Sequence, residues 1–298
     1  MLRFTKLCAV ILTVLLISGC TATPPMQTDI AATTGPVAQF ARAIVEGTDL
    51  RVAQLITDSV SCVHDYSLSV RQMELVETSD LVLLSGAGLE EFMEDVLESA
   101  NAVVDCSSGV ELREPEEHDH HDHGHDDAHG HNHEEDPHIW LDPMRAVQMA
   151  ENICAGLSAQ YPEHGALFRT NTDVLVRQLN DLQAYGEATL SNLSCREIIT
   201  FHDGFGYLAD AFDLEIVAAI EEESGSEASA KDLIEIIEEI EHHALPAVFT
   251  EINGSVSAAS VIQAEIGVGV YDLDMIMGGS DYFSAMKANF DTLKEALQ

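Results

Sequence analysis

Positive charge is scarce in this sequence. Lys and Arg contribute 13 residues of 298 while Asp and Glu contribute 52, which gives a formal net charge of −39. The segment 114–136 holds 10 of the acidic residues and no basic one, so the remainder still carries −29, from 42 acidic and 13 basic residues. Such a surface excludes nucleic-acid binding, because phosphate contacts need clustered Lys and Arg, but it attracts divalent cations.

The apolar stretch at the N-terminus is too short for a membrane span. Leu7–Ile17 follows a positively charged start, as the apolar part of a signal peptide does. It ends in Ile17-Ser18-Gly19-Cys20, which resembles a bacterial lipobox, in which the Cys is lipidated and becomes the new N-terminus. We expect residues 1–20 to be a lipoprotein signal peptide and 21–28 a tether, so that the protein lies outside the cytoplasm, anchored to the membrane. A cleaved signal peptide with an incidental Cys is the alternative.

Cysteines are few. Of the six, Cys8 leaves with the signal peptide and Cys20 is the expected lipidation site. Four Cys remain, and an even number in an oxidising compartment indicates two disulfides. Of the three pairings, we favour Cys62–Cys106 and Cys154–Cys195, because each pair stays within one expected structural unit. Free buried thiols are the alternative.

Short apolar runs alternate with helical patterns in both halves of the chain, which predicts an α/β fold with parallel sheets. In the first half we expect strands at 29–33, 50–56, 81–84 and 102–105, and helices at 36–46, 70–77 and 90–99. In the second half we expect strands at 197–201, 214–218, 247–251 and 269–273, and helices at 207–211, after Ser229, from Ser257 and at 281–297. Ser229 and Asp232 have the spacing of a capping box at the start of one helix.

A long segment without proline separates the two halves. Residues 163–193 carry apolar side chains near helical spacing, and about 30 helical residues span roughly 45 Å. We predict two α/β lobes, 29–162 and 194–298, joined by one long rigid helix over 163–193. Two helices with a bend at Gly186 are the alternative.

Residues 114–137 form a low-complexity segment that cannot pack a core, because it has almost no apolar side chains. Its imidazoles alternate with carboxylates, and neutral imidazole is a good zinc ligand. Because many ligand sets overlap, we expect several weak, rapidly exchanging zinc sites. The eight His residues are His118, His120, His121, His123, His125, His129, His131 and His133.

Three other His residues stand apart from that segment, each beside expected core structure. His64 follows an expected strand, His138 lies in His138-Ile139-Trp140-Leu141-Asp142-Pro143, and His202 directly follows the strand ending at Phe201. Asp274 ends the last strand. Ligands of open parallel sheets bind beyond the carboxyl ends of strands, which places a site between the lobes. Three imidazoles and one carboxylate complete a tetrahedral zinc shell.

These segments resemble the zinc-specific solute-binding proteins of bacterial ABC transporters, in a family that also has manganese-specific members. The resemblance rests on His64-Asp65-Tyr66, the segment from His138 to Pro143, His202-Asp203-Gly204-Phe205-Gly206-Tyr207, and Leu273-Asp274. It implies two α/β lobes joined by one rigid helix, with Zn²⁺ between them. It also implies that His64, His138 and His202 are ligands and that Asp274 is the fourth. Here Asp274-Met275-Ile276-Met277 replaces the common Asp-Pro-Leu-Gly, so Glu251 or water is an alternative fourth ligand.

The expected function is extracytoplasmic capture of Zn²⁺ and its delivery to the membrane permease of an ABC transporter, by a monomer without enzymatic activity. Asp65, Asp203 and Glu251 are expected to support the ligands rather than to bind the metal. A surface protein that stores zinc, or an adhesin without a transporter, is a second possibility that rests on the same capture of metal. A zinc hydrolase is a third, but the chain has no His-Glu-x-x-His motif.

Overall fold

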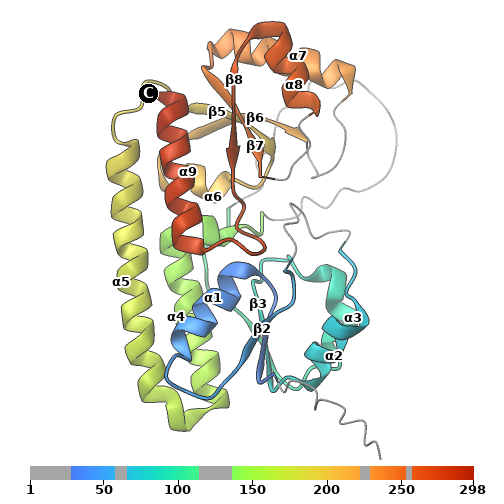
Figure 1. The fold of residues 1–298 in the computed structure, drawn as a ribbon, viewed down its shortest axis with the longest axis vertical. Coiled ribbons are helices and arrows are strands. Elements are labelled where there is room, and N and C mark those ends of the chain that lie inside the picture. Colours follow the sequence, from blue (N-terminus) through green and yellow to red (C-terminus); the bar gives the residue numbers. More distant parts are fainter. Residues whose placement is uncertain (1–27, 58–65, 114–135, 222–228, 253–256) are drawn as a thin grey trace, which may run out of the picture.

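The computed structural model describes residues 28–57, 66–113, 136–221, 229–252 and 257–298. These residues form two lobes, each built on a four-stranded parallel sheet, with long helices along one side of the molecule (Figure 1). The two-lobed α/β fold is therefore as predicted.

The first lobe contains a sheet with the strand order β2-β1-β3-β4. Every strand pair is parallel, with Ile30 of β1 opposite both Val52 of β2 and Leu81 of β3. β1 and β3 are almost wholly buried, which explains their unbroken apolar sequences. The elements are β1 (Ile30–Ala32), α1 (Gly35–Ile44), β2 (Val52–Gln54), α2 (Val70–Thr78), β3 (Leu81–Leu84), α3 (Glu94–Leu97) and β4 (Val103–Asp105).

The second lobe repeats this plan with the strand order β6-β5-β7-β8, again all parallel. α7 begins with the predicted capping box, in which the Ser229 hydroxyl accepts from the Asp232 N–H and the Asp232 carboxylate accepts from the Ser229 N–H. The elements are β5 (Glu197–His202), α6 (Gly206–Ala211), β6 (Glu215–Glu221), α7 (Ala230–His243), β7 (Ala247–Glu251), α8 (Ser257–Ile266), β8 (Gly269–Leu273) and α9 (Tyr282–Leu297).

Two helices form a hairpin beside the lobes, and the longer one runs along both. α5 (Gly165–Leu190) is a single continuous helix within the predicted range 163–193, and Gly186 lies inside it without ending it. α4 (Pro143–Gln160) precedes it and was not predicted. α5 packs against α4 and α1 below and against α9 above, so it runs along both lobes (Figure 1).

One hydrophobic core extends through both lobes. Phe40 of α1, Phe168 of α5 and Phe290 of α9 belong to the same buried cluster, as do Trp140 and Tyr207. Two smaller clusters lie in the individual lobes. The lobes therefore share buried surface instead of meeting through a linker alone.

The segment after β8 binds back to the first lobe. The carbonyl of Met277 accepts from the N–H of Gly35 at 2.9 Å, and the carbonyl of Gly278 accepts from the side-chain amide of Gln54 at 2.9 Å. Gly35 lies shortly after the end of β1 and Gln54 ends β2, so these contacts are made at the carboxyl edge of the first sheet. The carboxyl edges of both sheets therefore face the junction between the lobes.

The favoured disulfide pairing is wrong. Cys154 and Cys195 both have free thiols. Cys154 lies near the end of α4, whereas Cys195 lies beyond the far end of α5, about 30 Å away along the helical hairpin. A disulfide needs Cα atoms within about 7 Å. Cys106, the expected partner of Cys62, is also a free, buried thiol, and burial raises its pKa well above the usual value.

Several predicted features lie outside the described residues. They are the signal peptide with Cys20, the tether up to residue 27, Cys62, His64, Asp65 and the eight His residues of the segment 114–137. In the part of the chain that is described, no helix combines the length and apolarity that a membrane span needs.

Candidate metal centre

His138 stands at the junction between the lobes. It precedes a short 3-10 helix, Ile139–Leu141, that leads into α4. The residue is buried, with 5% exposed, and its ring contacts the Trp140 ring at a centroid distance of 5.3 Å. A buried imidazole beside an aromatic ring is held in place by packing and is shielded from solvent.

Asp136 fixes the orientation of His138. One carboxylate oxygen, Oδ1, accepts from the backbone N–H of His138 at 2.9 Å and lies 2.8 Å from its Nδ1. We assign the proton to Nδ1 from this contact, because the carboxylate can only accept. Nε2 is then the nitrogen that can bind a metal ion, as in carboxylate–histidine–zinc arrangements.

His202 reaches the same place from the second lobe. It is the last residue of β5 and is buried, with 7% exposed. Its ring meets that of His138 edge to face, at a centroid distance of 5.3 Å and an interplanar angle of 89°. Two buried imidazoles from different lobes therefore converge, as the sequence predicted.

Gly204 leaves room for the His202 ring. A Cβ atom at this position would lie 2.6 Å from Cδ2 and 2.9 Å from Nε2 of His202, and 2.6 Å from the Met275 methyl carbon. The glycine is needed here for space, because its backbone φ is not in the left-handed region.

Two carboxylates occupy the carboxyl edge of the second sheet. Glu251 ends β7 and is buried, and its neighbour in β8 is Leu273, directly before Asp274. Asp274 is half-buried, and its Oδ1 accepts from the N–H of Ile276 at 2.7 Å. This contact supports Ile276 at φ +60°, a conformation that a β-branched residue rarely adopts.

Asp274 is also held by the last helix. Its N–H donates to the side-chain oxygen of Asn289 in α9, and the Asn289 amide donates to the Asp274 carbonyl, both at 2.8 Å. The backbone at Asp274 is therefore fixed at both its donor and its acceptor, which limits how far this carboxylate can move.

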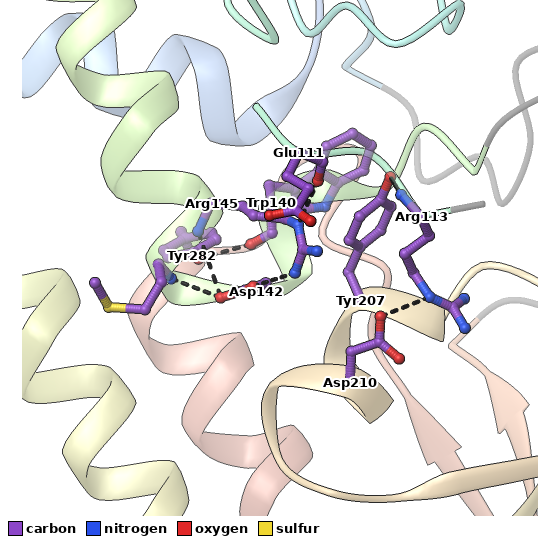
Figure 2. A network of polar contacts seen from close by, with 9 residues as sticks. Glu111, Arg113, Trp140, Asp142, Arg145, Tyr207, Asp210 and Tyr282 are labelled. Carbon is purple, nitrogen blue, oxygen red and sulfur yellow. Dashed lines mark hydrogen bonds and ion pairs between the residues drawn. The ribbon is translucent and has the colours of Figure 1, made fainter. Parts of the chain in front are cut away.

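Hydrogen bonds hold the segment around Trp140 from both lobes (Figure 2). The Trp140 indole donates to the Met275 carbonyl at 2.9 Å, and the Tyr282 hydroxyl donates to the Trp140 carbonyl at 2.7 Å. Asp142 caps α4 and pairs with Arg145 at 2.6 Å, while the Arg145 guanidinium lies 4.7 Å from the centre of the Tyr207 ring. Burial raises the pKa of Tyr207, so its hydroxyl stays protonated.

The described residues give part of the predicted ligand set. His138 and His202 come together, with Glu251 and Asp274 at the same sheet edge, while His64 lies outside the description. Among the described side chains, no three His, Cys, Asp or Glu residues are close enough together to hold a metal ion. Asp203 is exposed in the turn after β5, and its supporting role stays a prediction.

The sequence analysis missed Asp136. It treated this residue as one more acid of the low-complexity segment, although it lies two positions before His138. The Asp136-Pro137-His138 spacing was the available signal. A carboxylate two residues before an imidazole, with a conformationally restricted proline between them, can reach that ring.

Comparison with known proteins gives a consistent picture. A protein-family model described as zinc-uptake complex component A, periplasmic, matches residues 30–296. The zinc-binding lipoprotein AdcA of Streptococcus pneumoniae strain R6 is 29% identical over 279 residues, which cover 90% of this chain and 55% of that protein. The chain thus spans about half the length of the curated relatives it matches.

Solved structures are similar over nearly the whole chain. The crystal structure of ZnuA superimposes with a TM-score of 0.77 at 26% identity, covering 90% of this chain and 98% of that one. The Zn(II)-bound ZnuA-like domain of Streptococcus pneumoniae AdcA gives a TM-score of 0.74 at 25% identity, covering 91% and 99%.

Proposed function

We propose that this chain, which belongs to the family of periplasmic component A proteins of zinc-uptake complexes, binds Zn²⁺ outside the cytoplasm and delivers it to a membrane transporter. The observation that carries the proposal is the meeting of His138 and His202, two buried imidazoles contributed by different lobes. Imidazole ligands favour zinc over the harder divalent cations, which prefer oxygen.

The proposed tight site consists of His64, His138, His202 and Asp274. Asp274 has one carboxylate oxygen engaged by Ile276, which leaves Oδ2 for the metal. Glu251 is the alternative fourth ligand, because it ends the neighbouring strand. The eight His residues of the segment 114–137 are proposed as auxiliary weak sites. Separate Asp274→Asn and Glu251→Gln variants distinguish these two candidates for the fourth ligand. The variant that lacks the true ligand loses zinc affinity, and the other keeps it.

The proposed partner is the membrane permease of an ABC transporter. Lipidation at Cys20 would hold the protein at the outer side of the membrane, which keeps the bound metal close to the permease. The related lipoprotein AdcA supports an anchored form by its name. We propose that the protein acts as a monomer, and that it binds zinc without chemical turnover.

A calorimetric zinc titration tests this function. The mature chain and a variant lacking residues 114–133 should both show one tight site, because Asp136 and the isolated His residues are retained. His138→Ala and His202→Ala should each lose that site, whereas His164→Ala, at the remote end of α4 and α5, should keep it. A loopless protein without any tight site would refute the assignment.

A second measurement separates delivery from storage or adhesion. Reconstituted permease in proteoliposomes should take up zinc from the loaded protein, and the same protein carrying His202→Ala should support no uptake. Tight binding without delivery to any permease would favour a zinc-storing surface protein.

A further inference from the structure

Arg113 and Asp136 meet at the candidate metal centre. They are the described residues on either side of the segment 114–135. Nη1 of Arg113 lies 3.9 Å from Oδ2 of Asp136, and each side chain is 14% exposed. A guanidinium with so little exposure is unusual, because Arg side chains are mostly exposed unless they are paired.

Arg113 is hydrogen-bonded to the second lobe. Its Nε donates to the carboxylate of Asp210 in α6 at 2.8 Å, and its backbone N–H donates to the Tyr207 hydroxyl at 3.1 Å (Figure 2). Arg113 itself follows β4, in the first lobe. The residue therefore connects Asp136, which orients His138, to the helix that follows His202.

Gly206 provides the space in which this connection is made. A Cβ atom there would lie 1.5 Å from Nη1 of Arg113 and 3.0 Å from Oδ2 of Asp136. The guanidinium therefore lies directly against the backbone at the start of α6. Any side chain at position 206 would separate Arg113 from Asp136.

We propose that Arg113 is a positioning residue for zinc binding. It holds Asp136 in the orientation that fixes the His138 ring. Because Arg113 also contacts Asp210 and Tyr207, it couples that orientation to the position of α6 in the other lobe. This inference rests on the proposed function, because it assumes that His138 is a zinc ligand. Its consequence is that the affinity of His138 for metal depends on the relative position of the two lobes.

Zinc affinity of the full mature chain, measured by competition with a chromophoric chelator, tests the inference. Asp136→Ala should weaken binding about 10- to 100-fold, the usual effect of losing a carboxylate behind a metal-binding imidazole. Arg113→Gln should weaken it several-fold, up to about 10-fold, within the same range. In the Asp136→Ala background, Arg113→Gln should add almost nothing, because Arg113 acts through Asp136.

The matched control is Arg51→Gln. Arg51 also pairs with a carboxylate of the first lobe, Asp29, at 3.8 Å, but at the amino-terminal edge of the sheet. The Arg51→Gln variant should bind zinc with the same affinity as the wild type. If Arg113→Gln bound zinc as tightly as Arg51→Gln, Arg113 would not act on His138 through Asp136. The same would follow if the fold-losses in zinc affinity of Arg113→Gln and Asp136→Ala multiplied in the double variant.

Further variants separate positioning from folding. Arg113→Lys keeps a charge but cannot contact Asp136 and Asp210 together, so its affinity should lie between those of wild type and Arg113→Gln. Asp210→Asn should reproduce part of the Arg113→Gln loss with an unchanged melting temperature of the apo protein. If Arg113→Gln does not fold, these two variants decide, and wild-type affinity in both would overturn the inference.

A spectroscopic signature completes the test. In the zinc-loaded wild type, the ¹⁵N NMR shifts of His138 should show a protonated Nδ1, and Asp136→Ala should alter them. Wild-type protein that bound no tight zinc, or that kept it in His138→Ala, would overturn the proposed function instead. Normal wild-type binding with an unaffected Arg113→Gln would overturn this inference alone.

Discussion

Two glycines after β5 are needed because neighbouring side chains occupy the space of their missing Cβ atoms. Gly204 lies against the ring of His202, and Gly206 lies against the guanidinium of Arg113. Neither has a positive φ, so alanine would fit the backbone at both positions. A substitution at either site should therefore act on the metal centre more than on the stability of the fold.

Gly204→Ala should lower zinc affinity about 10-fold, the lower end of the range for disturbed ligand orientation. The added methyl would approach the Cδ2–Nε2 edge of His202 to less than 3 Å and would turn or displace the ring. Chelator competition measures the effect. Gly279→Ala is the control, because nothing lies within 4 Å of its Cβ position, and equal affinity in the two variants would contradict the explanation.

Glu90 is a buried carboxyl in the first lobe. It is 5% exposed and accepts from the Thr33 hydroxyl at 2.6 Å and from the N–H groups of Ser85 and Gly86 at 2.7 and 3.0 Å. Desolvation outweighs these hydrogen bonds and raises the pKa of Glu90 from 4.5 to about 7. The folded protein therefore keeps a proton here that the unfolded chain has already released near pH 5.

Stability should fall as the pH rises through the window from about 4.5 to about 7. In this window the folded state binds more protons than the unfolded state, so the free energy of unfolding decreases with pH. The shift in the pKa of Glu90 sets an upper limit of about 3 kcal/mol on this loss of stability. Glu90→Gln removes this titration, so urea denaturation from pH 5 to 8 should show wild type losing stability relative to the variant.

The control for this pH dependence is Glu91→Gln, at the exposed neighbouring position. It should leave the slope of wild type unchanged. Parallel stability curves for wild type and Glu90→Gln across this range would show that Glu90 is already ionised at pH 5.

At the scale of the element, α5 continues without a break through Gly186, where the helix packs closely against the second lobe. A Cβ there would lie 2.4 Å from Cε1 of Phe212 and 2.9 Å from Cζ of Phe290. The two rings pack edge to face at 4.6 Å between α9 and the end of α6. Gly186 therefore lets α5 approach the second lobe, and the bend considered in the sequence analysis does not occur.

Gly186→Ala should destabilise the protein by about 1–3 kcal/mol, the range for overpacking a core, although alanine favours a helix by about 1 kcal/mol. Thermal denaturation of the apo protein measures this. Gly165→Ala, in the first turn of the same helix, meets its nearest atoms at 3.6 Å and should be neutral or stabilising. A stabilised Gly186→Ala would mean that α5 can move away from Phe212.

The elements that the sequence predicted best are the buried strands. β3 and β7 have the predicted bounds, because a buried parallel strand is an apolar run with clear ends. β8 also has the predicted bounds, although it is a less buried edge strand. α4 was missed although Asp142 and Pro143 form a helix start, and Ala146, Met149 and Ile153 are buried at helical spacing. Small and flexible side chains give that stripe little hydrophobic contrast.

For the metal centre too, the sequence could predict only those features that local patterns encode. His202 was singled out because it follows a recognisable strand, and His138 because its segment carries the resemblance to the zinc-specific solute-binding proteins. The contact of Arg113 with Asp136, Tyr207 and Asp210 depends on how the two lobes pack, which no spacing in the sequence encodes. The disulfide prediction failed for the same reason, since it assumed that nearness in sequence meant nearness in space.

At the scale of the whole molecule, three connections restrain the lobes. α5 runs along both of them, the common core joins α1, α5 and α9, and the segment 275–282 is bound to the first lobe. Gln39 of α1 accepts from the Tyr282 N–H and donates to the Ser280 carbonyl. A wide hinge motion would have to break these contacts and bend a continuous helix, whereas a small tilt would not.

Zinc binding should therefore raise the melting temperature while leaving the overall dimensions almost unchanged. A ligand held from both lobes stabilises only the folded state, by roughly 3 kcal/mol when free zinc is 100-fold above the dissociation constant. For a chain of this size that is a rise of several degrees. Small-angle scattering of the apo and zinc-loaded protein should give nearly superimposable profiles. His202→Ala, measured alongside, should show neither a zinc-dependent rise in melting temperature of this size nor a change in dimensions. A large decrease in the radius of gyration of wild type on zinc addition would instead mean that α5 bends, and that the shared core opens in the apo state.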